Sequence, residues 1–178
     1  MDIVDFFQLS SGKWFSHRTS HLLTDKRSEG GKSEVLVEML PKTAPEVIQL
    51  CEQYGIDPDW ALCGSRISWN GTIEEKKKQS GSTVLVPIAD SEQANMGKLL
   101  RKIDSAEKPV AGRYAVGSDE ALTLIIEDGP FYSEERIWFA SPNLRLRTTI
   151  LKQADGFSTA SFSSEIRMGL TKPPENKS

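Results

Sequence analysis

The sequence lacks the features that mark membrane proteins, nucleic-acid-binding proteins and metalloproteins. No apolar run in its 178 residues approaches the roughly 20 residues that a membrane-spanning helix needs, so no membrane insertion is expected. The 22 Lys and Arg residues are outnumbered by 25 Asp and Glu residues, which argues against a nucleic-acid surface. No Cys and His cluster has zinc spacing, and no glycine-rich phosphate-binding motif occurs. We therefore expect neither a bound metal nor a cofactor.

Cysteine is also scarce. Cys51 and Cys63 stand in unlike local contexts, which fits two reduced, buried thiols better than a disulfide. Residues 1–14 lack the basic region, apolar segment and small-residue site of a secretory signal, and this favours a cytoplasmic protein. The polar, proline-containing segment 171–178 is expected to be a disordered tail after a single domain, residues 1–170.

Two helices are predicted near the start of the chain. The segment 2–9 carries an apolar stripe at helical spacing. The segment 43–55 has a stronger signature, since Thr43 can act as N-cap, Glu46 can complete a capping box, and Gly55 can end the helix.

The rest of the chain predicts β-structure. Asn70-Gly71 is the strongest short hairpin signal in the sequence and predicts a turn between two strands. About ten strands at intervals of 8–12 residues indicate an antiparallel barrel or sandwich. The expected strands are 13–23, 34–40, 61–69, a strand from 72, 82–89, 99–103, 112–117, 121–128, 131–140, 144–153 and 157–168.

One predicted hairpin carries an unusual charge pattern. If 131–140 and 144–153 are joined by a three-residue loop, Ala140 faces Leu144 and Glu135 faces Thr149.

Strand alternation then places Glu135, Asn143, Arg145, Arg147 and Thr149 on one surface. The two guanidinium groups would stand roughly 7 Å apart along the strand, which suits two anionic groups or the two ends of one dianion. Charged residues are rarely buried, so a solvated outer face is the simpler interpretation, and the lumen of a barrel is the alternative. Periodicity leaves both open.

The segment ERIWFASPNLRLRTTI resembles the signature of the S-type phycobiliprotein lyases. The segments FFQLSSGKWFSHRTSHLL, SRISWNGTIE, GSTVLVPIAD and FSTASFSSEIRMG are also similar to this family in order and spacing. The resemblance implies a mainly β fold, a lipocalin-like antiparallel β-barrel, and Gly12-Lys13-Trp14 resembles the lipocalin opening. The family pattern has a second histidine where this chain has Leu22, which puts any role of that histidine in doubt.

The resemblance also implies an activity, the attachment of a linear tetrapyrrole (a phycobilin) to a cysteine of a phycobiliprotein. Arg145 and Arg147 would bind the two propionates of the bilin. Glu135 would interact with the pyrrole nitrogens and favour the protonated, more electrophilic tetrapyrrole. Glu135 and Arg147 are thus the expected catalytic residues.

Five further positions are candidate bilin contacts. Thr149 and Asn143 could add hydrogen bonds, and His21 could contact the bilin or transfer a proton. Trp69 and Trp138 offer aromatic surfaces for stacking, with packing in the protein core as the alternative for each.

The resemblance implies phycocyanobilin or phycoerythrobilin as substrate and the α or β subunit of an apo-phycobiliprotein as partner. A lipocalin-type carrier of bilin or another hydrophobic anion, without attachment activity, is the alternative. A homodimer and a heteromer with a related lyase subunit are both compatible with the sequence. The expected location is the cyanobacterial cytoplasm, or the plastid of an alga.

Overall fold

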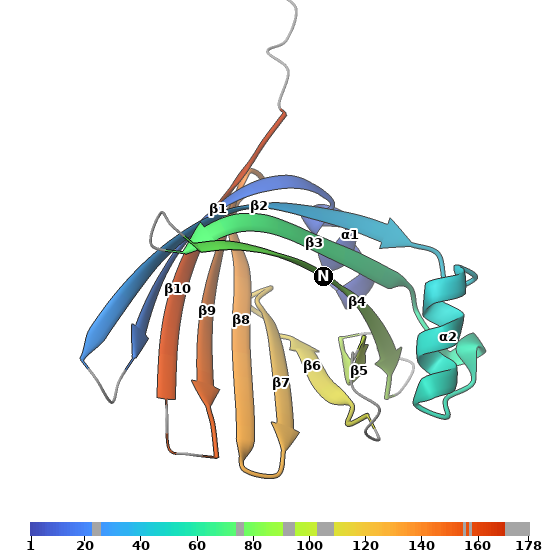
Figure 1. Ribbon diagram of the computed structural model, residues 1–178. Helices are drawn as coiled ribbons and strands as arrows, with labels where there is room; N and C mark the ends of the chain where they lie inside the picture. Colours follow the sequence, from blue (N-terminus) through green and yellow to red (C-terminus); the bar gives the residue numbers. More distant parts are fainter. Residues whose placement is uncertain are drawn as a thin grey trace, which may run out of the picture.

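The chain folds into a closed antiparallel β-barrel (Figure 1). The computed structural model describes residues 1–22, 26–73, 77–90, 95–102, 109–154, 156 and 158–169. Within these residues it has ten strands, two α-helices and one short 3-10 helix, which confirms the expected mainly β, lipocalin-like barrel. No helix in this part of the chain is both long enough and apolar enough to cross a membrane. The expected disordered tail, 171–178, lies outside the described residues.

The elements follow one another in a simple up-and-down order. Each strand pairs with its neighbours along the chain, and pairing of the first with the last closes the barrel. The helices are α1 Ile3–Ser10, α2 Pro45–Gln53 and the 3-10 helix η1 Pro58–Trp60. The strands are β1 Gly12–Leu22, β2 Arg27–Leu40, β3 Gly64–Ile73, β4 Lys77–Ala89, β5 Met96–Arg101, β6 Gly112–Val116, β7 Leu122–Asp128, β8 Phe131–Ser141, β9 Leu144–Lys152 and β10 Ser158–Arg167.

Helix α1 closes one end of the barrel. Asp2 accepts a hydrogen bond from the Asp5 backbone amide, and the Asp5 side chain accepts one from the amide of Asp2. The apolar stripe of α1, Ile3, Phe6 and Phe7, packs against inward-facing side chains of β5 to β8. The inside of the barrel at this end is therefore a packed core.

Trp14 ties the first strand to this core. Its ring is completely buried, and Nε1 donates a hydrogen bond to the Ser10 carbonyl oxygen at 2.8 Å. The guanidinium carbon of Arg167 lies 4.2 Å from the ring centroid. Arg167 also donates to the carbonyl oxygens of Leu9 and Ser11 at 2.7 and 2.6 Å. These bonds fasten the end of β10 to the connection between α1 and β1.

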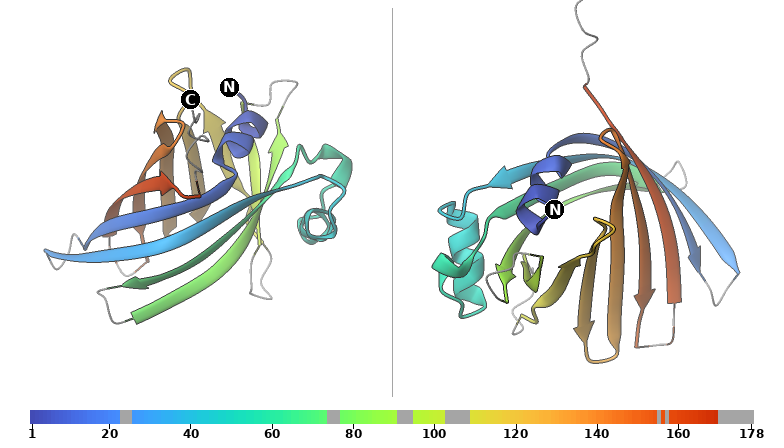
Figure 2. Two further views of the ribbon diagram at one scale, coloured as in Figure 1. Left: turned by 90° about the horizontal axis from the view of Figure 1, so that it is seen from above. Right: turned by 180° about the vertical axis from the view of Figure 1, so that it is seen from behind.

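Helix α2 packs on the outside of the barrel wall (Figure 2), and Val47 and Leu50 contact β4 and β5 there. The predicted capping box is wrong, because the N-cap is Ala44 and it forms no side-chain cap hydrogen bond. The Glu46 carboxylate instead forms an ion pair with Arg66 of β3. That ion pair joins the start of α2 to the barrel.

The predicted turn at Asn70-Gly71 is also wrong. Both residues lie within the β3–β4 ladder, where Asn70 pairs with Ser80. The backbone of β2 passes so close to Gly71 that a Cβ there would overlap the Lys32 carbonyl oxygen and Cα and Cβ of Ser33. Glycine at this position permits close strand packing and does not form a turn.

Candidate functional site

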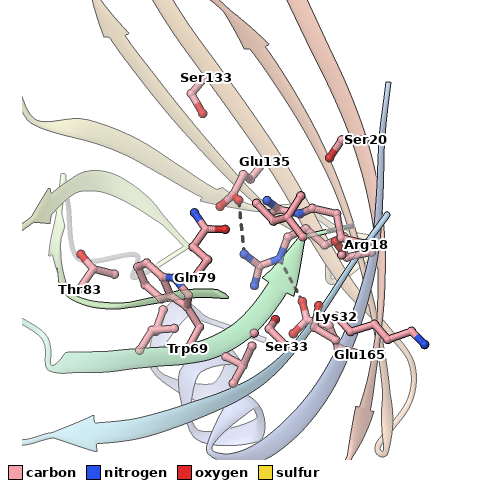
Figure 3. A pocket seen from close by; sticks show the side chains of 18 of the residues that line it. Arg18, Ser20, Lys32, Ser33, Trp69, Gln79, Thr83, Ser133, Glu135 and Glu165 are labelled. Atoms are coloured by element: carbon pink, nitrogen blue, oxygen red, sulfur yellow. Dashed lines mark hydrogen bonds and ion pairs between the residues drawn. The ribbon is translucent and has the colours of Figure 1, made fainter. Parts of the chain in front are cut away.

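A cavity of about 520 Å³ occupies the barrel beyond the α1 core. One wall, formed by β1, β8, β9 and β10, carries most of its charged groups. The opposite side, formed by β3 and β4, carries Trp69, Gln79 and Thr83 (Figure 3). The cavity is thus a hollow with one ionic wall and one largely neutral wall.

The β8–β9 register confirms the predicted pairing, and this face points into the barrel, since Glu135 and Arg147 line the cavity. Glu135 pairs with Thr149, Ile137 with Arg147, and Phe139 with Arg145. The register shifts after Phe139, so that Ser141, and not Ala140, faces Leu144. This irregularity affects the turn and leaves the charged face as predicted.

Cross-strand pairing shows how far each inward-facing side chain lies from the open end of the barrel. The deepest row contains Ser16, Glu165 and Arg145, and the next row toward the open end contains Arg18, Ser163 and Arg147. A third row contains Ser20, Ser161, Thr149 and Glu135. Alternation along a strand fixes which face a side chain occupies, and these rows fix how deep it lies.

Arg147 stands between two carboxylates. Its Nη1 donates to Glu135 Oε1 at 3.3 Å, and its Nε lies 3.1 Å from Glu165 Oε1, an ion-pair contact without hydrogen-bond geometry. Dashed lines in Figure 3 mark these contacts at the labelled Glu135 and Glu165. Burial by itself would lower the pKa of Arg147, but Glu165 and Glu135 outweigh it and raise that pKa. Arg147 is therefore a firmly charged group with two counter-ions.

Arg145 lies behind the cavity wall. Its Nη2 donates to Glu165 Oε2 at 2.5 Å, and its guanidinium carbon lies 4.9 Å from the Trp14 ring centroid. The side chain is only 4% exposed and does not line the cavity. Burial lowers the pKa of Arg145 more strongly than Glu165 raises it. Against the prediction, Arg145 is placed to hold Glu165 and not to touch a propionate.

Glu165 connects the two arginines. Burial would raise the pKa of this carboxyl group, but Arg147 and Arg145 together hold it below its ordinary value. The side chain is 2% exposed, so it is a buried anion compensated by two cations.

Among the described residues of the ionic wall, Arg18 is the cation that has no protein counter-ion. It lines the cavity from β1, and within the described residues it forms no ion pair. Its side chain reaches solvent through the open cavity. Burial against the cavity walls, and then Arg147, lower its pKa. Arg147 lies two strands away at the same depth, roughly 10 Å by strand spacing. The guanidinium, which stays protonated, is thus an unpaired donor facing the hollow.

Trp69 lies on the cavity wall, which is one of the two positions expected for it. It lines the cavity from β3, opposite Gly81 of β4. A Cβ at Gly81 would lie 2.6 Å from Trp69 Cζ2, so the indole ring lies directly on the glycine backbone. Glycine at 81 therefore sets the position of this ring.

Three predicted ligand contacts lie elsewhere. Trp138 faces outward, where the Arg136 guanidinium carbon stands 6.0 Å from its ring centroid. His21 is exposed on the outer side of β1, because its parity is opposite to that of Trp14. Asn143 is exposed in the β8–β9 turn. These three assignments are corrected to positions outside the cavity.

Thr149 has an indirect place in the site. It shares the inward face with Glu135, and its hydroxyl donates to Glu135 Oε1 at 3.4 Å. It is not among the residues that line the cavity. Thr149 is therefore placed to orient the carboxylate.

Arg18 and Glu165 belong to the site although neither was predicted. Arg18 could have been found by parity, since it shares the inward face of Trp14 on β1, whereas Glu165 required the β9–β10 register, in which it pairs with Arg145. In the described part of the chain, no three His, Cys, Asp or Glu side chains gather as a metal site would require. The arrangement can bind an anion, stack a conjugated group and present a carboxylate to N–H donors.

Comparison with known proteins gives the family. A family model described as CpeS-like protein matches residues 2–168. The chain is 61% identical over 175 residues to a chromophore lyase CpcS/CpeS of Thermosynechococcus vestitus, covering 97% of this chain and 96% of the relative. It is 39% identical over 171 residues to the phycocyanobilin lyase subunit CpcS of a Picosynechococcus species, covering 94% and 86%.

A solved structure agrees with the sequence relatives. The S-type phycobiliprotein lyase CPES from Guillardia theta matches with a TM-score of 0.87 and 33% identity, covering 96% of this chain and 95% of that one. The chain therefore belongs to the CpeS-like family, the S-type phycobiliprotein lyases that its sequence resembles.

Proposed function

We propose that this protein is a bilin lyase, which binds a phycobilin in the barrel and promotes its attachment to a cysteine of an apo-phycobiliprotein. The observation that carries the proposal is the cavity itself, which combines a guanidinium at Arg18 that no described residue pairs, a carboxylate at Glu135 and an aromatic wall at Trp69. Its family membership supports the same activity.

The chemistry is an addition. The thiolate sulfur of the partner protein bonds to the exocyclic ethylidene carbon of an end ring, and a proton is added to the neighbouring ring carbon. No group leaves and no electron acceptor is needed. The lyase has to hold the tetrapyrrole in one shape, polarise its conjugated system and present that ring to the partner.

Each charged group of the ionic wall has a role in the proposal. Arg18, with Arg147 beside it, binds one bilin carboxylate, and Arg18 contributes a donor that no carboxylate among the described residues occupies. Glu135 accepts hydrogen bonds from pyrrole N–H groups and stabilises the protonated tetrapyrrole, which makes the end ring more electrophilic. Glu135 is suited to this because its contacts with Arg147 and Thr149 are long, at 3.3 and 3.4 Å.

The finer identity of substrate and partner belongs to the same proposal. The bilin is phycocyanobilin or phycoerythrobilin, and the acceptor is the α or β subunit of a phycobiliprotein. The relative named as a lyase subunit supports a working unit of more than one chain, either a homodimer or a heteromer with a related subunit. We place the reaction in the cyanobacterial cytoplasm, with an algal plastid as the equivalent compartment.

Co-production with a bilin source and single apo-subunits tests the activity. Covalent colour on an apo-subunit, retained in denaturing gels, is expected only when the lyase is present. A coloured barrel that never yields a thioether on any subunit would identify a carrier and contradict the proposal. Glu135→Gln is expected to keep the bound bilin and slow its transfer.

A further inference from the structure

We propose that Arg101 forms a second carboxylate-binding site of the cavity, separate from the ionic wall, and that it receives the other propionate of the bilin. This inference deepens the proposed function and depends on it. It starts from the charge balance of the residues that face the hollow.

The arginines of the ionic wall are almost fully neutralised by protein. Arg145 and Arg147 share Glu165 and Glu135, two cations with two anions. Arg18 is then the only guanidinium left over among the described residues of this wall. A bilin carries two propionates, so one more cation is needed from elsewhere in the cavity.

Arg101 supplies that cation from the far side. It is the last residue of β5, and its side chain lines the cavity beside Leu99 and Leu85. Leu100, the next residue back, faces the α2 core, so alternation places Arg101 on the inward face. Within the described residues Arg101 forms no ion pair, and its Nε is buried without a hydrogen-bond partner. Among the described residues the Arg101 guanidinium thus has no protein counter-ion and its Nε has no acceptor, while its side chain lines the cavity, where a ligand carboxylate would supply the missing anion.

The strand order places Arg101 across the barrel from the ionic wall. In the closed ring, β5 is separated from β10 by five steps in either direction. The strand β10 lies between β1, which carries Arg18, and β9, which carries Arg147. A ligand that spans the hollow would therefore meet a guanidinium group at each side.

The position of Arg101 is fixed from outside the barrel. The Tyr54 hydroxyl, just after α2, donates to the Arg101 carbonyl oxygen at 3.0 Å and lies 3.4 Å from its amide nitrogen. These contacts hold the end of β5 against α2. Lys32 is not an alternative, since its amine points away from the cavity (Figure 3).

The test compares phycocyanobilin with its dimethyl ester, measured by absorbance titration. Arg101→Gln is expected to weaken binding of the diacid by about tenfold to a hundredfold and to leave binding of the diester unchanged. Arg113→Gln is the matched control, because Arg113 is an exposed arginine of the neighbouring strand paired with Glu127. It is expected to change neither affinity, and circular dichroism verifies that each variant is folded.

A double variant decides whether the two arginines serve different carboxylates. If they do, the losses in Arg18→Gln and Arg101→Gln multiply in the double variant, as for independent sites. A double variant no worse than Arg18→Gln alone would overturn the inference. Equal loss of diacid and diester in Arg101→Gln would also overturn it, since the residue would then only shape the cavity.

Failure of this inference is distinguishable from failure of the proposed function. If the wild type binds the diacid and Arg18→Gln weakens it while Arg101→Gln does not, only the role of Arg101 is overturned. If the wild type binds neither form of the bilin, the proposed function fails, and this inference fails with it.

Discussion

Arg145 Nη2 donates a 2.5 Å hydrogen bond to Glu165 Oε2, and the two side chains are only 4% and 2% exposed. A buried ion pair contributes little net stability compared with an apolar pair, but removal of one partner leaves an uncompensated charge in the core. Arg145 therefore has a structural role, unlike Arg18 and Arg147, which lie on the same barrel wall and face the cavity.

Arg145→Met is expected to destabilise the fold by about 3–5 kcal/mol, because it leaves Glu165 with one cation. Urea unfolding followed by circular dichroism measures the change. The double variant Arg145→Met/Glu165→Met removes the stranded anion, so it should lose less stability than the sum of the single losses. A single variant as stable as the wild type would contradict the structural role of Arg145.

Unlike Arg145→Met, Arg18→Gln is expected to reduce bilin affinity and to leave the stability of the fold nearly unchanged. Arg18 forms no ion pair among the described residues, and burial and then Arg147 disfavour its charged form, so the free energy of unfolding should change little. Bilin affinity should fall by about tenfold to a hundredfold, the usual loss for a charge-assisted hydrogen bond. Absorbance titration measures it, and unchanged affinity would remove Arg18 from the site.

The sequence correctly predicted which side chains share one face of the strands, but not which of them reach the cavity. Alternation along β8 and β9 correctly placed Glu135, Arg145 and Arg147 together, because side-chain direction repeats every two residues. Whether an inward residue reaches the cavity depends on what fills the barrel beneath it. Arg145 is buried because Trp14 and Glu165 surround it, and both come from other strands.

The wrong predictions for His21 and Gly71 have the same cause, namely contacts with other strands. His21 has the opposite parity to the buried Trp14 on the same strand, and this places it on the outside. Gly71 was read as a turn residue because its sequence neighbour is Asn70, although close approach of β2 is what requires glycine there. Such contacts between distant segments are not visible in a local pattern.

Gly81→Ala should displace Trp69, because the new Cβ would lie 2.6 Å from Cζ2 of the ring. A well-placed aromatic contact contributes roughly 0.5–1.5 kcal/mol to binding. Its loss should therefore weaken bilin binding by about two- to tenfold. Gly30→Ala is the control, since Gly30 also lines the cavity and a Cβ there would meet nothing within 4 Å. Equal affinities of the two variants would contradict the stacking role.

The two cysteines are expected to be unreactive in the folded protein. Burial, and then the charge of Asp2, raise the pKa of Cys63 to about 12, and burial also raises the pKa of Cys51. At pH 8 only about one Cys63 thiol in ten thousand would be ionised. Iodoacetamide should therefore modify both residues in urea and neither in buffer, as read by mass spectrometry. Rapid labelling of either cysteine in the native protein would contradict this prediction.

Glu165 should make the stability of the fold sensitive to acid. Because its folded pKa lies below its ordinary value, Glu165 contributes stability above about pH 4.3, the unfolded value. That contribution is lost as the pH falls through the lowered folded pKa. Glu165→Gln lacks it at every pH, so the difference in unfolding free energy between wild type and variant should be greatest near pH 7 and shrink in acid.

Glu127→Gln is the matched control for this titration. Glu127 pairs with Arg113 on the surface, where the side chains are 60% and 65% exposed, and such pairs contribute about 0–1 kcal/mol. This variant should follow the wild-type stability curve at each pH in urea unfolding. A constant gap between wild type and Glu165→Gln from neutral to acid pH would show that the carboxylate does not gain from Arg145 and Arg147, and the charge balance assigned to the ionic wall would then be incorrect.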